Sequence, residues 1–291
     1  MYFAWIARIL LISLLAAALL LGVQLFLMWK YDQETTISFL AVGQGDAILI
    51  QSGHEQVLID GGRDGSVLLA ALGEKIPFYD RTIEVVIATH PDADHIGGFP
   101  MLFERYQIGQ FIETGFSQIE TTEKTTDDLI LLRRALERFG IQRDIPGRAG
   151  VILHLRHGGS LEILYPRKLP LARDLSSNEG SIVTRFTFGK TDFLFTGDLP
   201  HEEEFLPMVQ PVEVLKAAHH GSASSTSDAW LDLVRPKEVI LSVGENNYGH
   251  PASQVLERFA QRQITSLRTD EDGSITYVCM VDQESCVREV E

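Results

Sequence analysis

The chain begins with a long apolar segment and continues with short segments of alternating polarity. Residues 9–29 are apolar with few interruptions, and Arg8 and Lys30 flank them. Because about 20 helical residues span a bilayer core, this segment predicts one transmembrane helix. Residues 1–31 are therefore predicted to be a membrane anchor. A removed signal peptide is the competing interpretation, but its apolar core is usually about 7–15 residues long, and no cleavage site follows here.

Two observations favour a position outside the cell membrane for the region after the apolar segment. Arg8 places a positive charge on the N-terminal side of the apolar segment, while Lys30 is soon followed by acidic residues. Cys279 and Cys286 lie on the two arms of a predicted hairpin, residues 275–281 and the segment after a turn at 282–285. A disulfide between them would fit an oxidising compartment, and two free thiols are the alternative.

After residue 35, apolar runs of strand length alternate with turns and with segments of helical spacing. No repeat or linker divides this region, so residues 35–291 are predicted to form one α+β domain. Strands are expected within 35–50 and at 56–59, 83–88, 161–165, 181–188, 192–196, 213–217, 238–243 and 275–281, and helices at 66–72, 125–140, 228–234 and 253–262.

The helix expected at 125–140 is amphipathic. One face carries apolar residues at helical spacing, and the other carries three arginines, which we interpret as a solvated face with phosphate contact as the alternative. The apolar residues are Leu129, Leu132, Leu136 and Phe139, and the arginines are Arg133, Arg134 and Arg138.

The formal net charge of −15 excludes a broad basic surface for nucleic acid. A narrow basic groove for one strand remains compatible with that charge. Lys216, Arg156 and the arginines within 133–148 are the candidates for such a groove.

The densest chemistry follows the predicted strand at 83–88. His90, Asp92, Asp94 and His95 fall within six positions, and Gly97-Gly98 come directly after them. A loop at a strand end can turn such residues toward metal ions, and glycines allow the backbone to pass close by. Two further strand ends carry Asp198, in Thr-Gly-Asp, and the pair in His219-His220-Gly221-Ser222.

These motifs resemble the metallo-β-lactamase superfamily. The matching segments are His-x-Asp-x-Asp-His-x-Gly-Gly at 90–98, Thr-Gly-Asp at 196–198, His-His-Gly-Ser at 219–222 and Asp-Gly-Gly at 60–62. Within it, the chain is most similar to the C-terminal domain of ComEC-type competence DNA-uptake proteins. Residues 39–47, Asp92, Ser177-Asn178 and Gly249-His250-Pro251 carry that similarity, which covers about residues 36–280.

The resemblance implies a four-layer αβ/βα sandwich with two metal ions between the sheets and a metal-bound water as nucleophile. It implies that the first metal is held by His90 and Asp92, the second by Asp94, His95 and His219, and both by Asp198. It further implies catalytic roles for Asp94, His220 and His250, and supporting or substrate-binding roles for Asp60, Asn178, Ser222, Gln44 and Asp46.

One departure from the family pattern concerns the first metal. The usual third histidine of that site should fall near Ser177-Asn178, and no histidine is there. Asp92, where a histidine is more usual, also makes the site harder, so Zn²⁺ and Mn²⁺ are both expected cofactors.

The leading hypothesis is a phosphodiesterase or nuclease acting on DNA, because an oxygen-rich pair of metals suits phosphoryl displacement. Hydrolysis of a lactone, thioester or amide is the second hypothesis, and a tethered module with a degenerate metal site is the third. Single-stranded DNA, the membrane and separate competence channel proteins are the expected partners, since one predicted span cannot form a pore.

Overall fold

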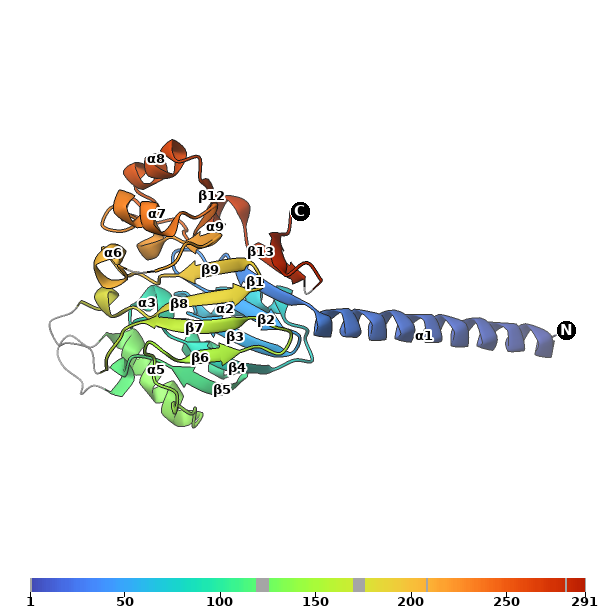
Figure 1. Ribbon diagram of the computed structural model, residues 1–291. Helices are drawn as coiled ribbons and strands as arrows, with labels where there is room; N and C mark the ends of the chain where they lie inside the picture. The colour runs from blue at the N-terminus through green and yellow to red at the C-terminus, as the bar shows by residue number, and fades with distance from the viewer. Residues whose placement is uncertain (1, 119–125, 170–175, 208, 281, 291) are drawn as a thin grey trace.

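The computed structural model describes residues 2–118, 126–169, 176–207, 209–280 and 282–290. Helix α1 (Tyr2–Gln33) projects away from a body built of two packed sheets (Figure 1). Met1, Thr125 and Val281, which belong to the predicted anchor, helix and hairpin, lie outside the described residues.

Helix α1 is long and apolar enough to cross a membrane. Its candidate span is Trp5–Phe26, and none of the most apolar window of that span is buried against the protein. Because the side chains of this window are exposed, they require an apolar surrounding, which agrees with a membrane association.

The first sheet has the strand order β14-β13-β1-β2-β3-β4-β5. It mixes antiparallel pairs around β1 and β2 with parallel pairs at β3, β4 and β5. Its strands are β1 (Thr35–Phe39), β2 (Ile48–Ser52), β3 (Glu55–Ile59), β4 (Thr82–Ile87), β5 (Gln107–Ile112), β13 (Ile275–Met280) and β14 (Ser285–Arg288).

The second sheet has the order β12-β11-β10-β9-β8-β7-β6. Parallel pairing joins β9, β10, β11 and β12, and antiparallel pairing joins the others. Its strands are β6 (Ile152–His154), β7 (Ser160–Tyr165), β8 (Val183–Phe188), β9 (Thr191–Phe195), β10 (Val214–Lys216), β11 (Glu238–Leu241) and β12 (Thr265–Arg268).

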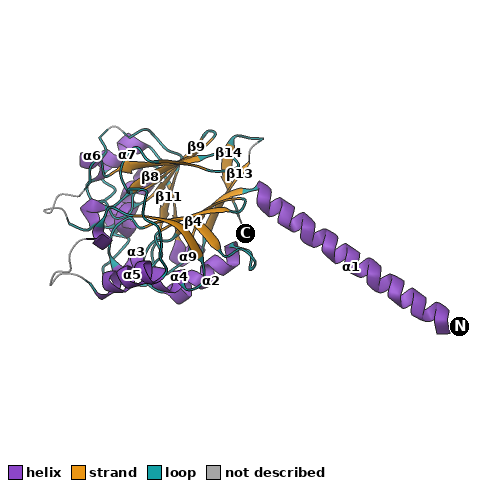
Figure 2. Ribbon diagram, turned by 90° about the horizontal axis from the view of Figure 1, so that it is seen from below, coloured by secondary structure: helices purple, strands orange, loops and turns teal. Residues whose placement is uncertain are grey.

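Helices cover the outer face of each sheet (Figure 2). One apolar cluster fills the space between the first sheet and its helices, a second lies between the two sheets, and a third lies under the helices of the second sheet. The helices are α2 (Gly65–Lys75), α3 (Ala93–Ile96), α4 (Phe99–Phe103), α5 (Asp127–Arg138), α6 (Glu202–Phe205), α7 (Asp228–Val234), α8 (Ser253–Gln261) and α9 (Thr269–Asp272). Three apolar interfaces require four layers, so the predicted αβ/βα sandwich is confirmed.

Most predicted elements are present, with ends that shift by a few residues. The prediction missed β5, β6, β12 and the short helices, because strands and helices of three to six residues show little periodicity. Phe139 was wrongly assigned to the buried face: it is 39% exposed beyond the end of α5, while Leu132 and Leu136 are buried as expected.

The two cysteines face each other on the predicted hairpin. Cys279 is directly opposite Cys286 in the pairing of β13 with β14, and the structure joins them in a disulfide. The hairpin lies beside β1, where Thr35 pairs with Cys279. The crosslink therefore fixes the edge of the sheet close to the point where α1 enters it.

The sheets have two functionally different ends. Helix α1 leads into the start of β1, and the amide of Gly53 in the β2–β3 turn donates to the carbonyl of Glu34 at that end. Asp60, His90 and Asp198 follow the opposite ends of β3, β4 and β9. The candidate ligands are therefore gathered at the end of the sandwich that is remote from α1 (Figure 1).

Glu202 provides a prediction about stability. Its buried carboxylate accepts hydrogen bonds from the amide of Thr226, and burial raises the pKa of Glu202 to about 8. Because the folded state holds this proton more tightly than the unfolded state, the stabilisation is complete below the ordinary pKa and is lost as the pH rises through about 8. The loss should amount to a few kcal/mol, since one pKa unit corresponds to about 1.4 kcal/mol.

Urea unfolding of the full chain in detergent, followed by circular dichroism between pH 6 and about 9.5, tests this. Glu202→Gln should flatten the pH dependence, whereas Glu204→Gln, at an exposed position of α6, should leave it unchanged. A wild-type stability that does not fall across this interval would contradict the assignment.

Candidate metal centre

The loop after β4 delivers the densest group of ligand-type residues. Strand β4 ends at Ile87, and His90 follows it with a fully buried side chain. Asp92 is the N-terminal cap position of α3, which then carries Asp94 and His95. The short helix turns His95 into the protein, where it is buried, while Asp94 remains partly open to solvent.

Close backbone contacts fix this loop. A side chain at Gly98 would lie 2.1 Å from the carbonyl oxygen of Gly61, and one at Gly45 would lie 2.2 Å from the carbonyl oxygen of Asp94. Only glycine permits such approaches. The two Gly-containing motifs therefore bring the 43–46 turn, residues 60–62 and α3 into contact.

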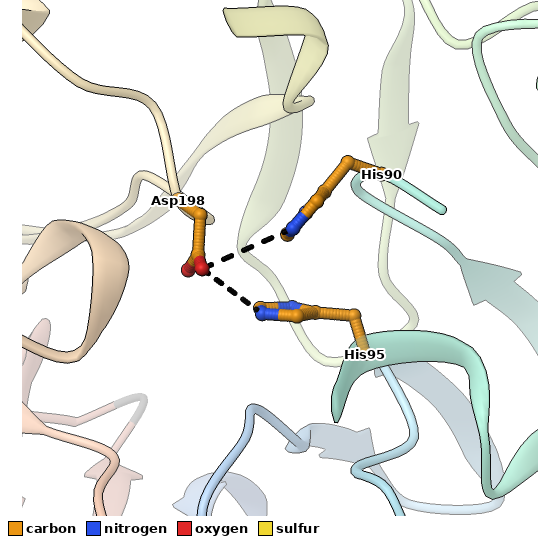
Figure 3. A group of neighbouring side chains, drawn as sticks. All are labelled: His90, His95 and Asp198. Atoms are coloured by element: carbon orange, nitrogen blue, oxygen red, sulfur yellow. Dashed lines mark ion pairs between the residues drawn. The ribbon is translucent and has the colours of Figure 1, made fainter. Parts of the chain in front are cut away.

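Asp198 lies at the centre of the site. Its Oδ2 is 3.4 Å from Nε2 of His95 and 3.9 Å from Nε2 of His90 (Figure 3). The same oxygen is 3.4 Å from Nε2 of His220 and 3.9 Å from Nε2 of His219. One carboxylate oxygen thus faces four imidazoles, so Asp198 would contribute to any ion that these side chains hold.

The pair His219-His220 adopts an unusual backbone conformation. Both residues have left-handed dihedral angles, with φ of 49° and 54°. Such strain in residues other than glycine is often found at functional sites, where the surrounding structure maintains it. The bend turns both rings toward Asp198.

His220 lies deeper in the site than His219. Its Nε2 is 3.3 Å from Oδ2 of Asp94, and its ring is 1% exposed, compared with 29% for His219. Groups able to hold an ion are formed by His90, His95 and Asp198 and by Asp94, His95 and His220. The geometry therefore favours His220 at the position that the sequence assigned to His219, and both assignments remain predictions.

Asp92 and Asn178 occupy the open side of the site. The Asp92 carboxylate is 42% exposed and lies 3.7 Å from Nε2 of His90. The amide nitrogen of Asn178 is 3.4 Å from Nδ1 of His219. Asp92 thus provides a carboxylate, and Asn178 an amide, at positions where the family pattern has histidines.

Unpaired polar atoms show that this site fits divalent cations. In the described part of the chain, the Nε2 atoms of His90, His95 and His220 and Oδ1 of Asp198 are buried without a hydrogen-bond partner. Buried polar atoms normally have partners, and leaving them unpaired costs free energy. Imidazole and carboxylate donors converging in this way suit Zn²⁺ or Mn²⁺.

The electrostatics of the site reflect its crowded charges. Burial alone would lower the pKa of His220, but Asp198 and Asp94 raise it to about 9. Burial likewise opposes the charged form of His95, while Asp198 and Asp60 raise its pKa well above the usual range. His90 has a lowered pKa because of its burial and the adjacent His95. Protons on His95 and His220 would therefore compete with metal binding.

A second layer of residues orients the imidazoles. Oδ2 of Asp60 is 2.8 Å from Nδ1 of His95, and the backbone amide of Thr89 donates to the other carboxylate oxygen of Asp60. This fixes His95 so that Nε2 faces Asp198. Asp60 therefore lies where it can orient His95, and its supporting role remains a prediction.

Lys216 is the main feature that the sequence interpretation placed incorrectly. It is fully buried on β10, forms an ion pair with Asp46, and donates a 3.0 Å hydrogen bond to the carbonyl oxygen of Gly197. It therefore cannot line an exposed groove. Arg156 belongs to the β6–β7 turn at the end that carries α1, because the adjacent His157 donates to Ser52.

The remaining predicted residues surround the site in different ways. Gln44 accepts a hydrogen bond from the amide of Gly244, and the Nδ1 atom of His220 lies 3.5 Å from Oδ1 of Asp46. Ser222 bonds to Ser224 within its own loop. The His250 ring is 5.2 Å from the His219 ring, so His250 lies on the rim of the site.

The fold and this site define a class of protein. The sequence profile of the Metallo-beta-lactamase superfamily matches residues 40–245, and the chain belongs to that superfamily. A solved metallo-beta-lactamase fold protein, YhfI from Bacillus subtilis, superposes with a TM-score of 0.52 at 14% identity, covering 80% of this chain and 95% of that one.

Two curated relatives are ComEC-type competence proteins, as the motifs predicted. ComE operon protein 3 of Bacillus subtilis is 30% identical over 87% of this chain and 34% of its own length. Recombination protein 2 of Haemophilus influenzae is 30% identical over 85% of this chain and 28% of its own length. The chain thus spans about a third of the curated relatives that it matches.

The buried ion pair gives a prediction about stability. Lys216→Met should cost about 3–5 kcal/mol of unfolding free energy, because it leaves the Asp46 carboxylate buried without its cation. The double variant Lys216→Met/Asp46→Leu should recover most of that loss. Urea unfolding measures both, and Lys190→Met, which removes an exposed pair with Glu284, is the control expected to change little. Equal losses in the single and double variants would contradict the role of the pair.

The two adjacent histidines give a prediction about metal binding. His220→Ala should weaken the binding of Mn²⁺ at least about ten-fold, as expected for a group that contacts the ion directly or orients a ligand. His219→Ala should have the smaller effect, because its ring is farther from Asp94 and Asp198. Titration calorimetry of the full chain measures both affinities, and the reverse order would restore the assignment of His219 made from sequence.

Proposed function

We propose that this protein is a membrane-tethered, metal-dependent phosphodiesterase that cleaves single-stranded DNA. The observation that carries the proposal is the donor set: carboxylates of Asp92, Asp94 and Asp198 share the site with three buried imidazoles. Hard oxygen donors suit cations that stabilise the attacking and leaving oxygens of a phosphoryl displacement.

His90, Asp92, Asp94, His95, Asp198 and His220, with His219 beside them, would hold the ions. When bound, such ions supply a nucleophile at neutral pH and stabilise the negative charge that develops on phosphate. Asp60 holds His95 in the orientation required, and Lys216 holds Asp46 beside His220. His250, on the rim, is the candidate to donate a proton to the leaving oxygen.

The relatives support a role connected with DNA uptake. Competence channel proteins are proposed as partners of this domain, because the relatives that it matches are competence proteins. The disulfide favours an extracytoplasmic domain, since disulfides persist in oxidising compartments, and the apolar helix would tether that domain to the membrane.

The activity is tested on the full chain in detergent or lipid nanodiscs with Mn²⁺ or Zn²⁺. Single-stranded DNA, bis-p-nitrophenyl phosphate and a panel of lactones are the substrates. The wild type should cleave the phosphodiesters, and His95→Ala should reduce kcat/KM at least about a hundred-fold, because one donor is lost from both ion-binding groups. His154→Ala is the matched control, since His154 is exposed on β6, away from the site.

The outcomes separate the alternatives. Turnover of lactones alone would move the protein to carbonyl hydrolysis, which the burial of Lys216 and the distant position of Arg156 make the second candidate. Near-zero metal content by mass spectrometry, together with no turnover, would leave a tethered, non-catalytic module.

A further inference from the structure

We propose that Tyr248 forms a stacking platform for a nucleobase next to the phosphodiester at the metal centre. The inference rests on the proposed function and adds to it the part of the substrate that is recognised: an unpaired base, rather than phosphate alone. It is carried by the position, the exposure and the fixed geometry of this one aromatic ring.

Tyr248 continues a row of rings that begins at the metal centre. The His219 ring is 5.2 Å from the His250 ring, and the His250 ring is 5.9 Å from the Tyr248 ring at an interplanar angle of 32°. His219 itself lies 3.9 Å from Asp198. The phenol ring therefore lies on the rim of the candidate metal centre, separated from His219 by the His250 ring.

The side chain is open where a base would need it to be. Tyr248 is 70% exposed, although it follows a buried strand and lies beside partly buried histidines. The exposed ring offers an apolar π-face on which a nucleobase can stack.

The loop that carries Tyr248 is held in place by Asn246. The Asn246 amide nitrogen donates to the carbonyl oxygens of Gly244 and His250, at 2.9 and 2.8 Å. Its oxygen accepts from the backbone amides of Tyr248 and His250, both at 3.1 Å. Because these four bonds fix the backbone, stacking would cost little conformational entropy.

Charge makes a stacking contact more necessary here. The chain carries −15, so a broad electrostatic attraction cannot hold a polyanion, and Lys216 is buried within the site. Stacking on an aromatic ring does not depend on charge, and every base offers a π-face. A base held by Tyr248 would position the adjoining phosphate at the metal centre.

The test compares variants of the Mn²⁺-loaded full chain on an oligothymidylate and on an oligonucleotide that is abasic around the cleavage position. Tyr248→Ala should raise KM for the first substrate about ten-fold, as expected for the loss of one stacked base, with kcat less affected. Tyr248→Phe and Tyr248→Trp should retain wild-type KM. Phe78→Ala is the control, since Phe78 is 78% exposed at the other end of the molecule.

The abasic substrate gives the decisive comparison. The wild type should lose about the same factor on it, and Tyr248→Ala should lose nothing more, because base and ring form one contact. The platform would be overturned if the effects of the abasic substrate and of Tyr248→Ala on KM were additive. It would also be overturned if Tyr248→Ala had the wild-type KM on oligothymidylate.

Binding measured by fluorescence anisotropy separates this inference from the activity. A wild type that binds oligothymidylate without cleaving it would overturn the proposed nuclease activity, while the affinity of Tyr248→Ala would still decide the platform. A wild type that neither binds nor cleaves would overturn both.

Discussion

The buried ion pair between Lys216 and Asp46 is the interaction on which the site depends. Asp46, Asp60 and Asp198 are all buried within a few ångströms of the same imidazoles, although each buried carboxylate costs free energy unless a cation accompanies it. Lys216 supplies one permanent positive charge, and it also holds the Gly197 carbonyl directly before Asp198. The carboxylates of Asp60 and Asp198 must share protons or metal ions with the histidines. The folded protein therefore has a site for cations at this point.

The topology explains how these charges reach one point. Strand β4 of the first sheet and strands β9 and β10 of the second end on the same side of the sandwich, and each passes directly into a ligand-bearing loop. The apolar cluster between the sheets holds these three strand ends at fixed separations. Ions bound there would contact both halves of the molecule, so binding would also stabilise the closed sandwich.

The sequence predicted what is encoded locally and by motif. The dense ligand stretch from His90 to His95, the strand that precedes it and the amphipathic α5 were all readable from residue type and spacing. The burial of Lys216 was not, because a lysine at the end of a three-residue strand normally predicts solvent, and its partner Asp46 is far away in sequence. The sequence could not show which of His219 and His220 lies deeper in the site. That difference depends on left-handed backbone angles, which no pattern of residue types specifies.

The separation of anchor and site determines how a substrate can approach. Helix α1 enters β1 at Thr35, and the disulfide hairpin braces the same end of the sheet. Asp198, His220 and Tyr248 lie at the opposite end, which would face away from the bilayer with α1 inserted in a membrane. Under the proposed function, a long DNA strand could then approach the site without being dehydrated against lipid headgroups. The anchor would keep the site at a high local concentration beside a membrane channel that delivers the DNA. The β-strands of the sandwich therefore separate α1 from the candidate metal centre.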